Sequence, residues 1–270
     1  MPYLSYSDIF NPYDYLEQFV TFLDNIAYTP RNPLNTEMLF MWCMIQTFKP
    51  DLFIESGTYK GYSANFICEG LKHTSKDVNF VTYGYNLEDC IPYAKERLSI
   101  YDFAKVVEGN SRELIRDFNG EKRSTAFFIN GPKGKNLPQL LFSIINSFNN
   151  IAFIAVHDCE QESGSNNRWF AEQFRCLGFS SMFCGTDFQE KFAYLDKPLI
   201  GMEGMSNWRP YNKHDRPTPS YGTETGYLIP DLEYHYGIRN NLLASWLKLW
   251  FCLYPRVNRI YRKYTNKSQE

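Results

Sequence analysis

The sequence lacks the patterns that mark several classes of protein. It contains no C-x-x-C pair, and its seven cysteines are scattered singly, which argues against a zinc site of that spacing and against a disulfide framework. No apolar run approaches the roughly 18 residues of a membrane-spanning helix. The first residues, Met1-Pro2-Tyr3, show neither a basic region nor an apolar one, so we expect a reducing, cytoplasmic location.

The charge balance gives no reason to expect nucleic acid as a partner. The chain carries 28 Lys and Arg against 30 Asp and Glu, a formal net charge of −2 at pH 7, whereas nucleic-acid-binding domains present a basic surface. With 270 residues, 44% of them hydrophobic, the chain is long enough to bury a full core in one or two domains. We therefore expect a soluble globular protein.

The most informative stretch is residues 53–64, Phe-Ile-Glu-Ser-Gly-Thr-Tyr-Lys-Gly-Tyr-Ser-Ala, which predicts a buried strand that turns sharply into a helix. Gly57 and Gly61 allow a tight turn and close backbone approach. Such a turn lies beyond the carboxyl end of its strand, where open α/β sheets bind ligands through backbone N–H groups. The spacing is neither the dinucleotide fingerprint nor a P-loop, which disfavours a nicotinamide enzyme and a nucleotide triphosphatase.

The order of elements predicts the fold class. Five strand-like segments between residues 51 and 156 alternate with helical ones, which indicates an α/β, doubly wound, mostly parallel sheet. Residues 179–184 and 188–195, separated by a Gly-Thr-Asp turn, are predicted to close the sheet as two further strands. The predicted regions are an N-terminal helical cap (1–50), a Rossmann-like core (51–200), an irregular aromatic segment (201–238) and a basic amphipathic tail (239–270).

The run from Glu55 to Ser63, Glu-x-Gly-x-x-x-Gly-x-Ser, resembles the first motif of class I S-adenosylmethionine (SAM) dependent methyltransferases. It is especially similar to that of catechol O-methyltransferase-like enzymes and their relatives in sugar and antibiotic biosynthesis, and the resemblance covers residues 35–195. It implies a seven-stranded Rossmann-like sheet with an antiparallel edge hairpin, and SAM as the cofactor. It further implies that Glu55 reaches the methionine amino group, that Gly57 and Gly61 admit the cofactor, and that the region of Ser63 contacts its carboxylate.

The sequence departs from this family at the end of the second strand. Relatives hold both ribose hydroxyls with a carboxylate there, but one register places Gly84 at this position and another places Asn86. We assign the ribose contact to Asn86, with weakened affinity. The cofactor site is completed by residues of the first turn and of the later strand ends: Tyr59, Asn110 and Asn130.

The expected metal ligands and catalytic residues lie after the fourth and fifth strands. Metal-dependent relatives have an aspartate where this sequence has Asn130, while Asp158 matches a second ligand, so we predict a weak Mg²⁺ site at these two residues or none. His157 is the candidate general base, with Asp158 orienting its ring. The alternative role of His157 is to close a hydrogen-bond network at the strand end.

Two later segments bear on the substrate and on binding partners. The aromatic residues between 207 and 236 can fold over a sugar or phenol substrate, or pack as an irregular segment. Residues 239–267 contain seven Lys or Arg and no Asp or Glu, and Trp246 and Trp250 lie on a broad apolar face. This tail can make a peripheral contact with an anionic membrane, or dock on its own domain or on a second copy in a homo-oligomer.

Two function classes remain open. The first is a SAM-dependent O-methyltransferase that acts on a small-molecule or saccharide acceptor in polysaccharide or natural-product biosynthesis. The second is a non-catalytic, methyltransferase-like binding or scaffolding protein. The turn from Glu55 to Ser63 favours the enzyme, whereas Gly84 and Asn130 favour the binding protein.

Overall fold

The strands of the computed structural model form one seven-stranded sheet. The structure describes residues 4–26, 33–74, 77–118, 120–131, 136–159, 172–199 and 225–230. The strands are β1 (Leu52–Ser56), β2 (Asn79–Gly84), β3 (Ala104–Glu108), β4 (Thr125–Ile129), β5 (Ile151–Val156), β6 (Phe179–Cys184) and β7 (Thr225–Pro230). Their order across the sheet is β3-β2-β1-β4-β5-β7-β6. The first five strands run parallel, and β7 lies antiparallel to both β5 and β6.

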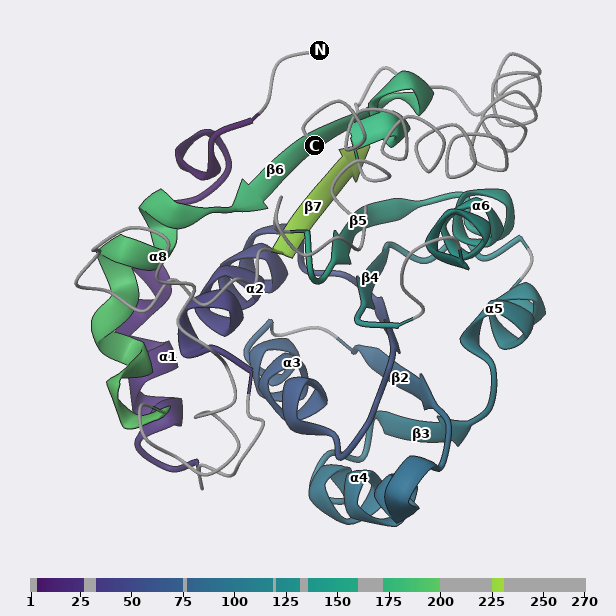
Figure 1. The fold of residues 1–270 in the computed structure, drawn as a ribbon, viewed down its shortest axis with the longest axis horizontal. Coiled ribbons are helices and arrows are strands. Elements are labelled where there is room, and N and C mark those ends of the chain that lie inside the picture. The colour runs from purple at the N-terminus through teal and green to yellow at the C-terminus, as the bar shows by residue number, and fades with distance from the viewer. Residues whose placement is uncertain are drawn as a thin grey trace, which may run out of the picture.

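Helices cover both faces of the sheet (Figure 1). The α-helices are α1 (Tyr13–Leu23), α2 (Asn35–Phe48), α3 (Tyr62–Lys72), α4 (Cys90–Leu98), α5 (Ser111–Leu114), α6 (Leu137–Ser147) and α8 (Thr186–Phe192). Short 3-10 helices are η1 (Tyr6–Asp8), η2 (Leu87–Asp89), η3 (Ile115–Phe118), η5 (Phe174–Leu177) and η6 (Ala193–Leu199). In Figure 1, α1, α2 and α3 lie to one side of the strands and α5 and α6 to the other.

Side-chain alternation along the strands builds a core on each face. In β1, Phe53 joins the cluster shared with α1, α2 and α3, whereas Leu52 and Ile54 join the cluster shared with α6. All five residues of β1 are buried, as expected for a strand in the middle of a parallel sheet. The predicted doubly wound, mostly parallel sheet with an antiparallel edge is therefore confirmed.

The prediction that residues 188–195 form a strand is wrong. The segment belongs to α8 and η6, and Phe188, Phe192, Leu195 and Leu199 are all buried. Their spacing of four, three and four residues is helical, so these side chains fall on one face. The short Gly-Thr-Asp turn suggested a hairpin, but it starts a helix instead.

The seventh strand comes from within the segment predicted to be irregular. Thr225–Pro230 enters the sheet between β5 and β6, and Tyr227 stacks on Phe40 of α2 with ring centroids 4.7 Å apart. The remainder of 201–238 and the whole tail from 239 to 270 lie outside the described residues, so the predictions made for them stay predictions. The domain boundaries also stay a prediction, although the sheet itself extends past residue 200.

A buried aspartate ties the start of α2 to η6. The carboxylate of Asp196 accepts hydrogen bonds from the backbone N–H groups of Asn35 and Thr36, at 2.7 and 3.2 Å, and from the Thr36 hydroxyl at 2.8 Å. These donors are among the first N–H groups of the helix, which have no partner within it. Burial raises the pKa of Asp196 to about 6.

Cys43, Cys68, Cys90, Cys159 and Cys184 are buried, as expected. Within the described part of the chain, none of the helices has the length and apolar character needed to cross a membrane.

Candidate cofactor site

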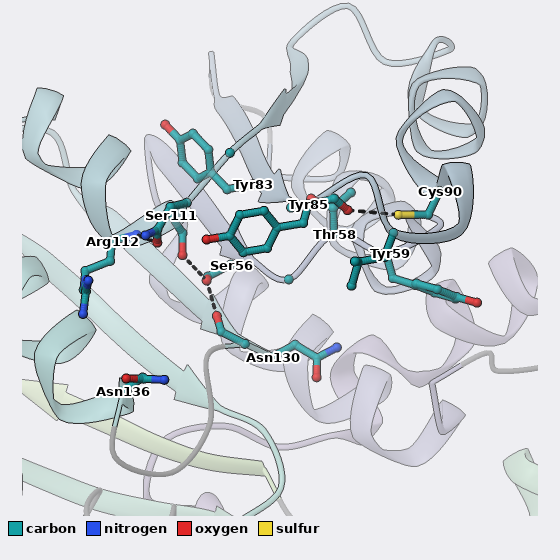
Figure 2. Close-up of a pocket in the computed structure, with 16 residues that line it drawn as sticks. Ser56, Thr58, Tyr59, Tyr83, Tyr85, Cys90, Ser111, Arg112, Asn130 and Asn136 are labelled. Atoms are coloured by element: carbon teal, nitrogen blue, oxygen red, sulfur yellow. Dashed lines mark hydrogen bonds between the residues drawn. The ribbon is translucent and has the colours of Figure 1, made fainter.

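A cavity of about 480 Å³ lies at the carboxyl ends of β1 to β4 (Figure 2). It sits where the strand order reverses between β1 and β4, the place at which open α/β sheets bind ligands. Its described lining residues are Ser56, Gly57, Thr58, Tyr59, Tyr83, Gly84, Tyr85, Leu87, Cys90, Gly109, Asn110, Ser111, Arg112, Asn130, Gly131 and Asn136.

The turn after β1 depends on a glycine at position 57. Gly57 has a φ of +109°, and a Cβ there would lie 3.0 Å from the Gly131 nitrogen and 3.1 Å from the Asn130 carbonyl carbon. Both contacts are with rigid backbone, so a side chain is excluded at this position. The absence of a Cβ therefore lets the turns after β1 and β4 meet at the cavity.

Three backbone N–H groups of this turn bond within the protein, contrary to the expectation that they face the ligand. Those of Gly57 and Thr58 donate to the Tyr83 carbonyl, at 2.8 and 3.1 Å, and that of Gly61 donates to the Thr58 carbonyl at 2.9 Å. Gly61 itself serves packing, because its missing side chain lets α3 approach Ala94 of α4. These three N–H groups stabilise the turn and are not available as donors to a ligand.

The packing of Thr58 explains the missing acid at the end of β2. A Cβ on Gly84 would lie 3.0 Å from the Thr58 Cβ and 3.2 Å from its hydroxyl oxygen. The Thr58 hydroxyl in turn lies 2.5 Å from that of Thr82. A carboxylate at position 84 would therefore require Thr58 to move.

Glu55 lies beneath the turn and does not line the cavity. Its side chain is fully buried, and its two carboxylate oxygens accept hydrogen bonds from the hydroxyls of Ser63 and Thr82, each at 2.5 Å. Burial raises its pKa to about 7. In this conformation Glu55 and Ser63 are bonded to each other, and neither reaches the space in which a ligand would lie.

The remaining predicted cofactor residues divide into two groups. Tyr59 and Asn130 line the cavity, as does Asn110, whose side-chain oxygen also caps α5 by accepting from the Arg112 N–H at 3.1 Å. The side-chain oxygen of Asn86 instead accepts from the Ile91 N–H at 3.1 Å, and Asn86 is not among the lining residues.

Several lining residues were missed by sequence reasoning. Tyr83, Tyr85, Ser111 and Arg112 follow or end neighbouring strands, so the rule that strand ends converge could have found them. The hydroxyls of Ser56 and Ser111 lie 2.6 Å apart and join two of the turns (Figure 2). Among the described lining residues, Arg112 is the one charged residue.

His157 lies between two carboxylates at the neighbouring strand end. Its Nδ1 is 3.1 Å from Asp158 Oδ1, and its Nε2 is 3.4 Å from Glu37 Oε2. Glu37, on α2, is buried and also accepts a hydrogen bond from the Thr225 hydroxyl at 2.9 Å. Asp158 has a φ of +56°, in the left-handed region that aspartate adopts more readily than most residues with a side chain. His157 and Asp158 are thus in contact as predicted, and no pattern in the sequence pointed to Glu37.

The described residues give no support for a metal centre. No group of three His, Cys, Asp or Glu in the described part of the chain is arranged to hold a metal ion. Residues 160 and 162, which could add carboxylates beside Asp158, lie outside that part. The weak site at Asp158 and Asn130 therefore stays a prediction.

Neither a family model nor a curated protein sequence matches this chain. Solved structures do, and they define its fold as that of class I methyltransferases. The O-methyltransferase from Bacillus cereus, in complex with SAH, matches with a TM-score of 0.51 and 16% identity over 81% of this chain and 90% of its own. Cofactor-bound Rv0187 from MTB matches with a TM-score of 0.51 and 16% identity, over 80% and 89%. The predicted resemblance is confirmed at the level of the fold.

Proposed function

We propose that the protein binds SAM in the cavity at β1 to β4 and transfers its methyl group to an oxygen of a small molecule or saccharide. The observation that carries this proposal is the position of the cavity at the reversal of strand order in a methyltransferase fold. Its volume of about 480 Å³ lies within the range of small-molecule sites.

The lining chemistry supports a ligand that combines apolar and polar parts. Tyr85 and Leu87 offer apolar surface for an adenine ring, while Arg112 suits the carboxylate of the methionine moiety. When bound, SAM supplies a methyl group made electrophilic by its sulfonium sulfur. Placement of donor and acceptor can then provide much of the acceleration, since the reaction is a displacement between two bound groups.

His157 is the proposed base for the acceptor hydroxyl. The carboxylate oxygens of Asp158 and Glu37 lie near its Nδ1 and Nε2, at 3.1 and 3.4 Å. Because β4 and β5 are neighbours in register, Ile129 lies beside Val156 and the two strand ends share one edge of the sheet.

Calorimetric titration with SAM and with its demethylated product, S-adenosylhomocysteine (SAH), tests this proposal. We expect both to bind, and we expect Arg112→Gln to weaken both by about tenfold, or 1.4 kcal/mol, because a charge-assisted contact is lost. Arg116→Gln is the matched control, since Arg116 is an exposed arginine of the same region that does not line the cavity. Equal effects of the two variants would contradict a role for Arg112 in binding.

The second candidate function is a binding or scaffolding protein without catalysis. It is favoured by the absence of any Asp or Glu among the described lining residues, because a sulfonium ligand gains from a nearby carboxylate. Failure of both SAM and SAH to bind the folded protein would support this alternative and remove the enzyme proposal.

Magnesium binding should be weak. With an amide at Asn130 in place of a carboxylate, we expect titration with Mg²⁺ to show millimolar affinity at best, because carboxylate number sets much of the affinity for a hard cation. Asn130→Asp should strengthen binding by about tenfold or more if Asp158 shares the site. Micromolar affinity in the unchanged protein would show that other residues complete a competent site.

A further inference from the structure

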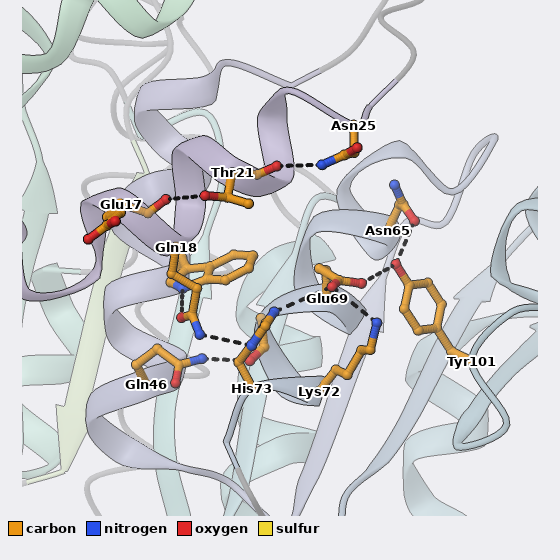
Figure 3. Close-up of polar contacts among 12 residues, drawn as sticks. Glu17, Gln18, Thr21, Asn25, Gln46, Asn65, Glu69, Lys72, His73 and Tyr101 are labelled. Atoms are coloured by element: carbon orange, nitrogen blue, oxygen red, sulfur yellow. Dashed lines mark hydrogen bonds and ion pairs between the residues drawn. The ribbon is translucent and has the colours of Figure 1, made fainter.

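A second hollow of about 1080 Å³ lies between α1 and α3, and we call it the α1–α3 groove (Figure 3). Polar side chains at helical spacing form its two walls. On α1 and just beyond it these are Asp14, Gln18 and Asn25, and on α3 they are Asn65, Glu69 and His73. Residues three, four or seven apart fall on one face of a helix, so each helix presents one stripe of hydrogen-bonding groups to the groove.

The floor of the groove is a directed hydrogen-bond chain. The Trp42 indole N–H donates to Gln18 Oε1 at 3.2 Å, and because an indole nitrogen only donates, this contact fixes the orientation of the Gln18 amide. Gln18 Nε2 then donates to His73 Nδ1 at 2.8 Å. His73 consequently carries its proton on Nε2, which faces Glu69 Oε1 at 3.4 Å. Three helices are thus linked by groups whose donor and acceptor roles are set.

Tyr101 makes further polar contacts with the α3 wall of the groove. The Tyr101 hydroxyl lies 3.0 Å from both Asn65 Oδ1 and Glu69 Oε2. Burial and the Glu69 charge raise the pKa of Tyr101, so the hydroxyl stays a donor. Because the hydroxyl carries a single proton, it serves one of these two acceptors at a time, so the contact links Tyr101 to Asn65 and Glu69 without fixing the Asn65 amide. Figure 3 shows the Asn65 amide nitrogen directed away from the Tyr101 ring.

The charge of the groove disfavours anions. Asp14, Glu17 and Glu69 line it, and Arg97 is the described lining residue of opposite charge. Lys72, just outside the lining, forms an ion pair with Glu69 at 3.3 Å. Arg97 is already engaged, because its Nε donates to the Lys60 carbonyl at 3.1 Å and its guanidinium lies 4.2 Å from the centre of the Tyr62 ring. Phosphates and acidic polymers would therefore meet net negative charge.

The mixture of groups matches a sugar. The half-buried Tyr15 and Phe22 bring aromatic surface to a groove that otherwise offers mainly amides and carboxylates. A saccharide presents hydroxyls that both donate and accept, and C–H faces that pack on aromatic rings. We propose that the α1–α3 groove binds a neutral saccharide chain, separately from the cofactor cavity.

The proposal stands independently of methyl transfer, because no residue lines both the groove and the cofactor cavity among those described. The two sites do approach each other at the turn between β1 and α3. Arg97 lines the groove and bonds to Lys60, while Tyr59 beside it lines the cavity. A saccharide in the groove would thus contact a residue that braces the cofactor turn.

Titration of the full chain with defined hexasaccharides tests the proposal. The neutral probes are maltohexaose, mannohexaose and chitohexaose, and the charged one is an oligogalacturonate. We expect at least one neutral probe to bind at millimolar concentration or below, and the anionic probe to bind at least about tenfold more weakly.

Blocking variants locate the binding. Thr21 is exposed on α1 and lines the groove, so Thr21→Trp should fill it and weaken saccharide binding by about tenfold or more. Asp24→Trp adds the same side chain at an exposed position of α1's end that does not line the groove, and should leave binding unchanged. Asn65→Leu provides a second test at the opposite wall if Thr21→Trp fails to fold.

The result that overturns the proposal is absence of binding by all three neutral probes, equal or tighter binding of a charged probe, or binding that the groove variants leave intact. SAM titration of the same variants separates the two proposals. The groove variants should bind SAM as the unchanged protein does, so loss of saccharide binding with SAM binding retained reports on the groove alone.

Discussion

Replacing Gly57 by alanine should destabilise the protein strongly and should remove SAM binding. The added Cβ would lie 3.0 Å from the Gly131 nitrogen and would occupy a backbone conformation with a φ of +109°. We expect a loss of about 3 kcal/mol in the free energy of unfolding, from strain together with the backbone contact. Denaturation in urea measures the stability, and calorimetry on the folded fraction measures the binding.

Gly120→Ala is the matched control for this change. Gly120 also has a positive φ, of +81°, but a Cβ there would have no atom within 4 Å. It should therefore lose about 1 kcal/mol through backbone strain alone and retain SAM binding. Equal losses in the two variants, with binding kept in both, would mean that the approach of the two turns at Gly57 is unimportant.

The second large effect is a dependence of stability on pH that Glu55 causes. Its pKa is raised from 4.5 to about 7 in the folded protein, so between these values the folded state holds a proton that the unfolded chain has released. Stability is then greatest at low pH and falls as the pH rises through this window. The shift corresponds to about 3 kcal/mol, lost by about pH 7.

Glu55→Gln should remove this dependence. A glutamine can accept from the Ser63 hydroxyl and donate to Thr82, whose own hydroxyl can then donate to Thr58. We expect the variant to be more stable than the unchanged protein above pH 7 and close to it at pH 4.5. Asp196, whose pKa is also raised, is present in both proteins, so only the difference between their urea profiles is diagnostic. Parallel profiles would show that Glu55 does not titrate in this window.

The parallel part of the sheet was predictable because its signal is local. Each of the first five strands is a short apolar run that ends at a turn residue, and a helix follows each of the first four in the observed order. The edge was harder to predict. Residues 188–195 contain three aromatic residues, which favour a strand, and also helix-forming residues, so the packing of Phe188 and Phe192 in the core beside α2 decides. Thr225–Pro230 ends in proline and contains glycine, which are strand-breaking residues.

In the candidate site, too, local patterns predict some features and packing decides others. Gly57, Tyr59, Asn110 and Asn130 line the cavity because strand ends converge whatever the side chains are. The direction of a side chain at a strand end is set by burial on one face of the sheet. Glu55 points into the packed layer with Thr82, a pairing between neighbouring strands that no pattern along a single segment reveals.

The strand order also has a consequence for how the protein is made. On the ribosome, β6 emerges before β7, yet β7 is its neighbour in the sheet and separates it from β5. The segment 179–184 therefore has no strand to pair with until residue 230 has left the exit tunnel. Glu37 likewise cannot accept its hydrogen bond from the Thr225 hydroxyl until Thr225 has been synthesised, 188 residues later. Contacts so distant in sequence form slowly, so the edge of the sheet beside His157 should be the last part of the nascent chain to become native.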